Sequence, residues 1–344
     1  MFAALTAAVM PVVLGGRFEA AGIYSHDRPI AEYLPGAAPT RQKSGGLARR
    51  HRLERRSLLK KLIVFALLTG CTVTGVDLPP VAPDSAGQQS QGRVIWHDLV
   101  TDDPEAVKRF YGELLGWQFR AVAEGDYHLI LNQGRAIGGM VDGRRFQQQG
   151  SISQWVVVLS VADLDDSVAA VTGSGGRLIG GPADLGRRGR LALAEDPRGA
   201  IFAMLQTLDG DPPEREAAVG EFMWNELWTD DAERSRKFYR ELMGYRQGEL
   251  HLDDGTVYRY LEGNGRPRAA VTPRPAETIG PTWVSIIRVA DVSAVSDRVE
   301  SLGGDLLLPA RSNPIGGELA VIRDPSGAGF VIQTWNYENK EPDS

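Results

Sequence analysis

Residues 94–117 read VIWHDLVTDDPEAVKRFYGELLGW, and residues 222–245 read FMWNELWTDDAERSRKFYRELMGY. The two stretches are offset by 128 residues, and 11 of the 24 aligned pairs are identical. The offset continues downstream, where WVVVLSVADLDDSVAAVTGSGG from Trp155 aligns with WVSIIRVADVSAVSDRVESLGG from Trp283, and DPRGAIF from Asp196 aligns with DPSGAGF from Asp324. A repeat this long predicts a duplicated domain, because solenoid units are only about 20–50 residues long.

Each copy predicts the order strand–helix–three strands, written twice. In the first copy VIWHDLV is a short strand, Asp103 is a helix N-cap, and Pro104 suits the first helical position. The helix is expected to end at Gly116 and to bury one apolar stripe, formed by Val107, Phe110, Tyr111, Leu114 and Leu115. Strands are then expected at 117–123, 126–132, 135–141 and 155–161, a helix after Asp163, and strands at 177–180, 190–195 and 200–206.

Taken together, these features resemble the vicinal oxygen chelate superfamily, which includes glyoxalase I, the bleomycin-resistance proteins and the extradiol dioxygenases. The resemblance rests on the order βαβββ-βαβββ, the helix ends FYGELLGW and FYRELMGY, the VAD openings and the turns DPRG and DPSG. It implies an α+β fold with two tandem domains at 93–207 and 220–335, a linker at 208–219 and a tail at 336–344. Each domain is expected to pair two βαβββ modules into a half-open barrel around a cleft. The scaffold hosts many chemistries, so the resemblance predicts the fold more sharply than the activity.

The residues before the first repeat have the layout of a bacterial secretion signal. RRHRLERRSLLKKLIVFALLTGC contains a basic run, an apolar run at 62–68, and small residues before Cys71. That apolar run is too short to span a bilayer, which needs about 20 residues. LLTGC resembles the lipobox of bacterial lipoproteins, which implies lipidation of Cys71 and an envelope protein facing the periplasm or the outside. Residues 59–70 are then the signal core and 71–92 a flexible tether; the alternative is a lone buried cysteine at a helix end.

Residues 1–58 do not fit a normal signal peptide. MFAALTAAVMPVVLGG is apolar but has no basic residues before it, and Gly, Pro and Arg are scattered through the rest. One interpretation is a translation start placed too early, with the native protein beginning at Leu59. The other is a genuine, long, disordered extension.

The residues before Cys71 and the rest of the chain differ in net charge, and the charge of the larger part argues against nucleic acid as a partner. Residues 1–70 hold 11 of the 38 Lys and Arg residues and 4 of the 44 Asp and Glu residues, a net charge of +7. The remaining chain therefore carries 27 basic and 40 acidic residues, a net charge of −13. A chain this acidic does not favour binding to a phosphate backbone, so nucleic acid is not an expected partner.

The four positions that hold a divalent metal in the superfamily's enzymes carry no metal-binding side chains here. The resemblance places them at Trp96, at residues 138–140, near Val156 and at Ala203 in the first copy. In the second copy they fall at Trp224, at residues 269–271, near Val284 and at Val331. Imidazole and carboxylate groups are the usual ligands of such ions, so no metal and no other cofactor are expected.

The first strand of each copy instead predicts an aromatic cleft with one carboxylate. Alternation places Trp96, Asp98 and Val100 on one face, and the superfamily layout implies that this face lines the cleft. The residues expected to bind a ligand are Trp96, Asp98, Tyr127, Trp224, Glu226, Trp228, Tyr258 and Tyr260. Ile95, Leu99, Met223 and Leu227 are expected to meet the helices. The alternative is that the tryptophans plug the barrel and the acids accept hydrogen bonds from neighbouring strands.

Three functions are compatible with this sequence. The first is a lipid-anchored envelope protein that binds a small aromatic or carbonyl compound without metal, as bleomycin-resistance members do. The second is a glyoxalase-type or dioxygenase-type enzyme with unusual ligands, using Asp98 or Glu226 with a histidine or tyrosine. The third is an interaction module whose clefts are filled. The expected partners are a small molecule and, through the anchor, a membrane; a homo-oligomer is also compatible with the sequence.

Overall fold

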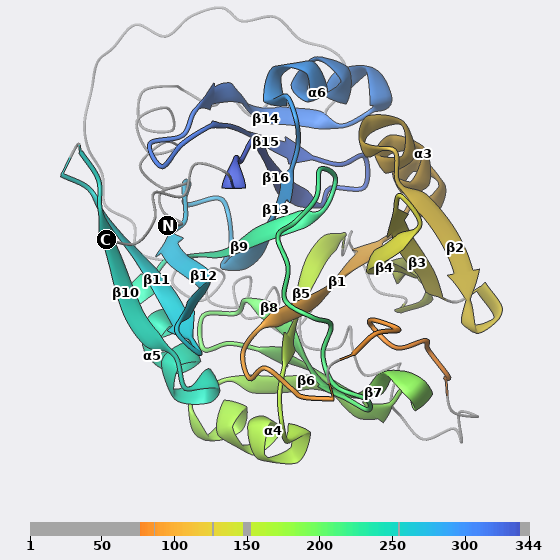
Figure 1. Ribbon diagram of the computed structural model, residues 1–344, viewed down its shortest axis with the longest axis vertical. Coiled ribbons are helices and arrows are strands. Elements are labelled where there is room, and N and C mark those ends of the chain that lie inside the picture. The colour runs from red at the N-terminus through yellow and green to blue at the C-terminus, as the bar shows by residue number, and fades with distance from the viewer. Residues whose placement is uncertain (1–75, 86, 126, 147–152, 254, 338–344) are drawn as a thin grey trace, which may run out of the picture.

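The computed structural model describes residues 76–85, 87–125, 127–146, 153–253 and 255–337. The sequence predictions for the extension at 1–58, the signal core at 59–70 and lipidation at Cys71 concern residues outside these ranges. The described chain folds into two domains, which are coloured orange to green and teal to blue in Figure 1. Within these ranges, no helix combines the length and the apolar run that a membrane span requires.

Each domain is built on one eight-stranded sheet. The first sheet has the strand order β2-β3-β4-β1-β5-β8-β7-β6, and the second repeats it as β10-β11-β12-β9-β13-β16-β15-β14. The strands of the first sheet are β1 Val94–Thr101, β2 Gln118–Val122, β3 Tyr127–Asn132, β4 Arg135–Asp142, β5 Gln154–Ser160, β6 Arg177–Asp184, β7 Gly189–Glu195 and β8 Ile201–Thr207. Those of the second are β9 Phe222–Thr229, β10 Arg246–His251, β11 Val257–Gly263, β12 Arg266–Pro273, β13 Thr282–Arg288, β14 Asp305–Ser312, β15 Glu318–Arg323 and β16 Gly329–Gln333.

The predicted duplication and fold class are confirmed by the strand register. In the first sheet Trp155 pairs with Leu99, and in the second Trp283 pairs with Leu227, so the two tryptophans occupy equivalent positions. In each sheet one βαβββ module pairs with the other through an antiparallel contact, β1 with β5 and β9 with β13. The sheets are open, not closed barrels, because their terminal strands do not pair with each other.

Four α-helices lie in the described residues, and their boundaries follow the predicted capping residues. They are α3 Pro104–Leu115, α4 Leu164–Gly173, α5 Ala232–Met243 and α6 Val292–Val299. The Asp103 side chain accepts a hydrogen bond from the amide of Ala106, and Asp163 does the same for Asp166. Gly116 ends α3 with φ of 75°, a left-handed conformation that glycine adopts without strain. Short 3₁₀ turns lie at η2 Ala123–Gly125, η3 Gly143–Phe146, η4 Gly186–Arg188 and η5 Glu300–Leu302.

The helices of the two domains meet and form two cores that both domains share. Figure 1 shows α3 beside α6 at one end of the molecule and α4 beside α5 at the other. One core joins Leu99 and Phe110 of the first domain to Phe330 and Ile332 of the second. The other joins residues such as Phe202 of the first domain to residues of the second that include Tyr239 and Trp283. Each domain has its own sheet, yet much of the apolar surface behind that sheet is covered by the other domain.

The repeated motifs FY and DP[RS]G hydrogen-bond across this interface. Trp155 Nε1 donates to the hydroxyl of Tyr111 at 3.0 Å, and that hydroxyl donates to Asp324 Oδ2 of the other domain at 3.2 Å. The equivalent set is Trp283 Nε1 to Tyr239 at 3.0 Å and Tyr239 to Asp196. The tyrosine motif of each domain is therefore completed by the turn of its neighbour.

His97 and Asn225, which occupy equivalent positions in the two repeats, contact each other. His97 Nε2 donates to Asn225 Oδ1 at 2.8 Å, and the imidazole stacks on Phe222 with ring centroids 3.8 Å apart. Residues that meet their own repeat equivalent mark the local two-fold axis relating the domains. Burial lowers the pKa of His97 to about 4, and the hydrogen bond to Asn225 opposes the effect only in part.

The part of the predicted tether that the structure describes is not free of the first domain. From residue 76 the chain runs along this domain, and Leu78 and Val81 are buried among its apolar residues. The amide of Leu78 donates to the carbonyl of Leu185 at 3.0 Å, and Asp77 forms an ion pair with Arg187. The expectation of a flexible tether is therefore wrong for this stretch, because two apolar side chains anchor it.

Candidate functional site

The face of each sheet turned away from the helices carries the predicted cleft residues. In the first domain this surface, here called the first cleft, contains Trp96, Asp98 and Tyr127 joined by hydrogen bonds. Trp96 Nε1 donates to the Tyr127 hydroxyl at 2.8 Å and to Asp98 Oδ1 at 3.1 Å, while Tyr127 donates to Asp98 Oδ1 at 2.5 Å. Gly139 makes room for this group, because a methyl group there would overlap the Tyr127 hydroxyl.

Arg188 completes the first cleft and was not predicted from the sequence. Its Nη1 donates to the Tyr127 hydroxyl at 2.7 Å, and its guanidinium lies over the rings of Trp96 and Tyr127 at 4.8 and 5.0 Å. Burial raises the pKa of Asp98, against the opposing effects of Arg188 and of its two hydrogen bonds. Burial also raises the pKa of Tyr127, and the Asp98 charge adds to the effect.

The equivalent surface of the second domain, the second cleft, repeats the tryptophan–tyrosine–carboxylate pattern. Glu226 accepts from the Tyr258 hydroxyl at 2.7 Å and from Trp228 Nε1 at 3.2 Å, and Trp224 Nε1 donates to Tyr258 at 3.2 Å. Tyr260 packs at the edge of the same cluster. All five predicted residues thus gather together, but Glu226 is 1% exposed and apolar side chains such as Leu308 and Leu319 fill the space around the tryptophans.

The positions that correspond to the superfamily's metal ligands do meet on these faces, but their side chains do not fit a metal ion. Trp96, Val156 and Ala203 lie in one apolar cluster of the first domain. Trp224, Ala270, Val284 and Val331 lie in one cluster of the second. Tryptophan, alanine and valine offer no oxygen, nitrogen or thiolate ligand to a divalent ion. Across the described ranges, no three His, Cys, Asp or Glu residues are grouped so that they could hold one.

A β-bulge makes one part of the predicted alternation wrong. Leu99 and Leu227 do pack in the helix-side cores, but Ile95 belongs to the first-cleft cluster and Met223 to the second. The register of β1 against β5 shifts between Val94 and Trp96, and the second sheet has the matching shift. The extra residue moves Ile95 and Met223 out of strict alternation.

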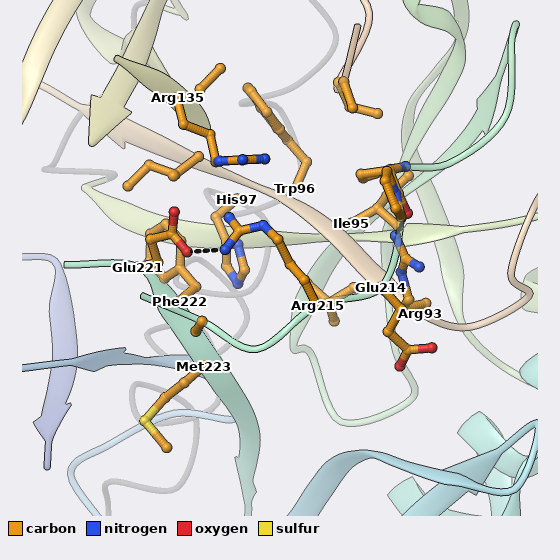
Figure 2. A pocket seen from close by; sticks show the side chains of 18 of the residues that line it. Arg93, Ile95, Trp96, His97, Arg135, Glu214, Arg215, Glu221, Phe222 and Met223 are labelled. Carbon is orange, nitrogen blue, oxygen red and sulfur yellow. Dashed lines mark hydrogen bonds and ion pairs between the residues drawn. The ribbon is translucent and has the colours of Figure 1, made fainter. Parts of the chain in front are cut away.

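A groove of about 1740 Å³ opens where the two domains and the N-terminal segment meet. Figure 2 shows Ile95, Trp96, His97 and Met223 among its lining residues, with several arginines around them. Arg215 pairs with Glu221 at 2.5 Å, as the dashed line marks. Trp96 of the first cleft and Trp224 of the second both line the groove, so both clefts border it.

Both repeats match known protein families. Residues 220–332 match the Glyoxalase/Bleomycin resistance protein/Dioxygenase superfamily, and residues 95–205 match the family described as a glyoxalase-like domain. Among curated proteins, the chain is 27% identical over 246 residues to CFP32 of Mycobacterium tuberculosis, which is named as a glyoxylase. That match covers 70% of this chain and 94% of the relative. The chain is also 28% identical over 255 residues to the anthracycline biosynthesis protein DnrV of Streptomyces peucetius, covering 70% and 92%.

Solved structures share the fold at low sequence identity. The Mn(II)-bound glyoxalase from Novosphingobium aromaticivorans superimposes with a TM-score of 0.52 at 16% identity, over 72% of this chain and 83% of that one. The substrate complex of homoprotocatechuate 2,3-dioxygenase from Brevibacterium fuscum gives 0.51 at 16% identity, over 77% and 86%. These neighbours share the fold, and the family matches cover both repeats; the chain therefore belongs to the glyoxalase/bleomycin resistance protein/dioxygenase superfamily, of which it carries two tandem domains.

Proposed function

We propose that the protein binds a small organic molecule in the first cleft, without the metal used by the superfamily's metalloenzymes. The supporting observation is the group formed by Trp96, Asp98, Tyr127 and Arg188, which combines two aromatic rings, a carboxylate and a guanidinium beside an open groove. An apolar wall with a few directed polar groups is the usual composition of a small-molecule site. Apolar side chains stand at the positions of the superfamily's metal ligands, so binding in this cleft would not use a metal ion.

The second cleft is proposed as a structural counterpart, not a second binding site. Its polar groups satisfy each other, and its carboxylate, Glu226, is 1% exposed, whereas Asp98 of the first cleft is half-buried. Of the two alternatives that the sequence left open, we propose the pocket for the first domain and the plug for the second. The second domain also covers the helix side of the first domain and so holds the first cleft in shape.

A matched pair of substitutions tests this proposal. We expect a library of small aromatic and carbonyl compounds to contain members that raise the Tm of the wild-type protein. The shift should vanish in Trp96→Phe, which removes the Nε1–H donor, and persist in Trp224→Phe, which removes the equivalent donor of the second cleft. If the Tm shift instead persists in Trp96→Phe and disappears in Trp224→Phe, the compounds bind in the second cleft and the proposal is wrong. A library without any binder would leave the interaction-module function as the better candidate.

We further propose that lipidation of Cys71 anchors the protein in a bacterial cell envelope. The support is the order basic run, short apolar run and LLTGC in the sequence. A single acyl chain gives only marginal membrane binding, so the stable anchoring typical of lipoproteins needs more than one chain. The test is fractionation of cells that express the wild-type chain or Cys71→Ser. We expect the wild type in the membrane pellet and the variant in the supernatant; a variant that still sediments with membranes would contradict the anchor.

A further inference from the structure

Arg188 is buried more deeply than an ordinary arginine, and only one of the two nitrogens on one edge of its guanidinium donates a hydrogen bond to a described residue. The residue is 2% exposed. Its Nη1 donates to Tyr127, and its Nε donates to the carbonyl of Pro79 at 2.9 Å. Its Nη2 is buried and has no hydrogen-bond partner among the described residues. An unsatisfied buried donor is costly, and more so when it carries charge.

The positive charge of Arg188 also lacks a direct counter-ion. Within the described ranges no carboxylate lies at ion-pair distance from it, and Asp98 is linked to it only through the Tyr127 hydroxyl. Its neighbour Arg187, by contrast, pairs with Asp77 at the surface. A buried charge is normally paired, so the first cleft has a place for a negative group that the chain does not fill.

The geometry of the guanidinium specifies which negative group fits. Nε–H and one Nη2–H lie on the same edge and point in parallel, which matches the two oxygens of a carboxylate. On this edge Nε donates to one peptide carbonyl, and Nη2 has no hydrogen-bond partner among the described residues. A carbonyl supplies one oxygen where a carboxylate would supply two.

The carbonyl belongs to a short segment that lies over the first cleft. Leu78 and Val81 are buried in the cluster that contains Trp96, Tyr127 and Leu129. The polar contacts of this segment are few: the Leu78 amide donates to Leu185, the Pro79 carbonyl accepts from Arg188, and the exposed Asp77 carboxylate accepts from the amide and pairs with the side chain of Arg187. Exposed pairs contribute little to stability, so the segment is held mainly by two apolar side chains.

From these contacts we infer that the first cleft is a carboxylate-binding site, and that residues 77–81 occupy it in place of the ligand. The ligand is a monocarboxylate with an apolar body about as large as the Leu78 and Val81 side chains together. Its carboxylate takes the Nε–Nη2 edge of Arg188, and its apolar body replaces the two side chains against Trp96. The inference rests on the proposed function and adds the class of ligand. The second domain has Gly316 at the position equivalent to Arg188, so the site is confined to the first domain.

Calorimetric titration of the full chain with 2-naphthoate, and with uncharged 2-naphthamide as its matched control, tests this inference. We expect naphthoate to bind at least about tenfold more tightly than naphthamide, because it forms a charge-assisted bidentate pair. Arg188→Lys keeps the charge but loses the fork, so it should abolish that preference, whereas Arg187→Lys at the exposed neighbour should retain it. Leu78→Ser should strengthen naphthoate binding several-fold by weakening the competing segment. Bound naphthoate should also speed hydrogen exchange of the Leu78 amide, which its displacement exposes.

Different outcomes would contradict the carboxylate site and the small-molecule cleft on which it rests. Equal affinity for naphthoate and naphthamide, lost in Trp96→Phe, overturns the carboxylate inference and leaves the small-molecule cleft standing. A naphthoate preference that survives in Arg188→Lys overturns the assignment to Arg188. If neither compound binds the wild type or Leu78→Ser, both the inference and the proposed cleft are overturned for ligands of this size. Should Arg188→Lys not fold, the comparison of naphthoate and naphthamide in the wild type and Leu78→Ser decides the inference by itself.

Discussion

Acidification should weaken the junction of the two domains through His97. The imidazole is 6% exposed and stacks on Phe222, and this burial favours its neutral form, against the smaller opposing effect of the hydrogen bond that it donates to Asn225. Its pKa is about 4 in the folded protein, compared with the ordinary value of 6.5 that applies to the unfolded chain. At 1.36 kcal/mol per pH unit, this difference corresponds to about 3 kcal/mol of unfolding free energy.

The sign follows from which state binds the proton more tightly. The unfolded chain takes up a proton on His97 as the pH falls through 6.5, while the folded protein does so only near pH 4. The stability contributed by neutral His97 is therefore fully present above about pH 6.5 and is lost progressively as the pH falls to about 4. Buried Asp98, Asp196 and Asp324 have raised pKa values and act in the opposite direction, so the effect must be isolated by difference.

Urea unfolding of the wild type, His97→Gln and His251→Gln between pH 7.5 and 4.5 provides that difference. Glutamine keeps an N–H donor for Asn225 but does not titrate, so the curve for His97→Gln should lack most of the acid loss seen in the wild type. His251, whose side chain is 74% exposed, should give a curve parallel to the wild type when it is replaced. Parallel curves for the wild type and His97→Gln across this range would refute the reasoning, as would a His97 pKa near 6.5 measured by NMR.

Four further predictions concern the domain interface, the first cleft and metal. Tyr111→Phe should cost about 1–3 kcal/mol of unfolding free energy, measured by urea unfolding, because Trp155 loses an acceptor and Asp324 a donor; a change below about 0.5 kcal/mol contradicts this role. Trp96→Ala should lower the unfolding free energy by about 3–5 kcal/mol on the same assay, since the ring is 3% exposed, and a neutral result would mean that the cleft collapses freely. A fragment of residues 76–211 should show no cooperative thermal transition by circular dichroism, because half of each helix-side core is missing; a sharp transition would show that the first domain folds alone. Dialysis against a chelator should leave the Tm of the full chain unchanged, and a lower Tm that added Zn²⁺ or Mn²⁺ restores would reveal a metal site.

The architecture could be predicted from the sequence because the sequence features that indicate each helix and strand occur twice, once in each repeat. The N-cap aspartates, the glycine helix ends and the paired Trp155 and Trp283 appear twice at one offset, and local turn and helix chemistry determines them. The gathering of Trp96, Asp98 and Tyr127 also followed, because strand alternation places the first two on one face.

Other features depend on contacts that no local pattern encodes. Arg188 could not be predicted from the repeat, because its equivalent in the second copy is Gly316 and the two copies therefore share no residue type there. Leu78 and Val81 lie among prolines, serines and glutamines, a composition typical of linkers, and only the cleft beneath them gives them a partner. The bond from Tyr111 to Asp324 joins residues 213 positions apart, which sequence periodicity cannot reveal.

The contact between His97 and Asn225 shows what fusion of the two domains permits. In an assembly of two identical chains, a residue on the symmetry axis can face only a copy of itself, so a histidine there must meet a histidine. One chain that carries both halves is free of that restriction. Here a donor, His97, faces an acceptor, Asn225, across the axis. The fused halves also stay together at any dilution, so a junction with an asymmetric hydrogen bond on its axis can persist where a dimer of separate chains would dissociate.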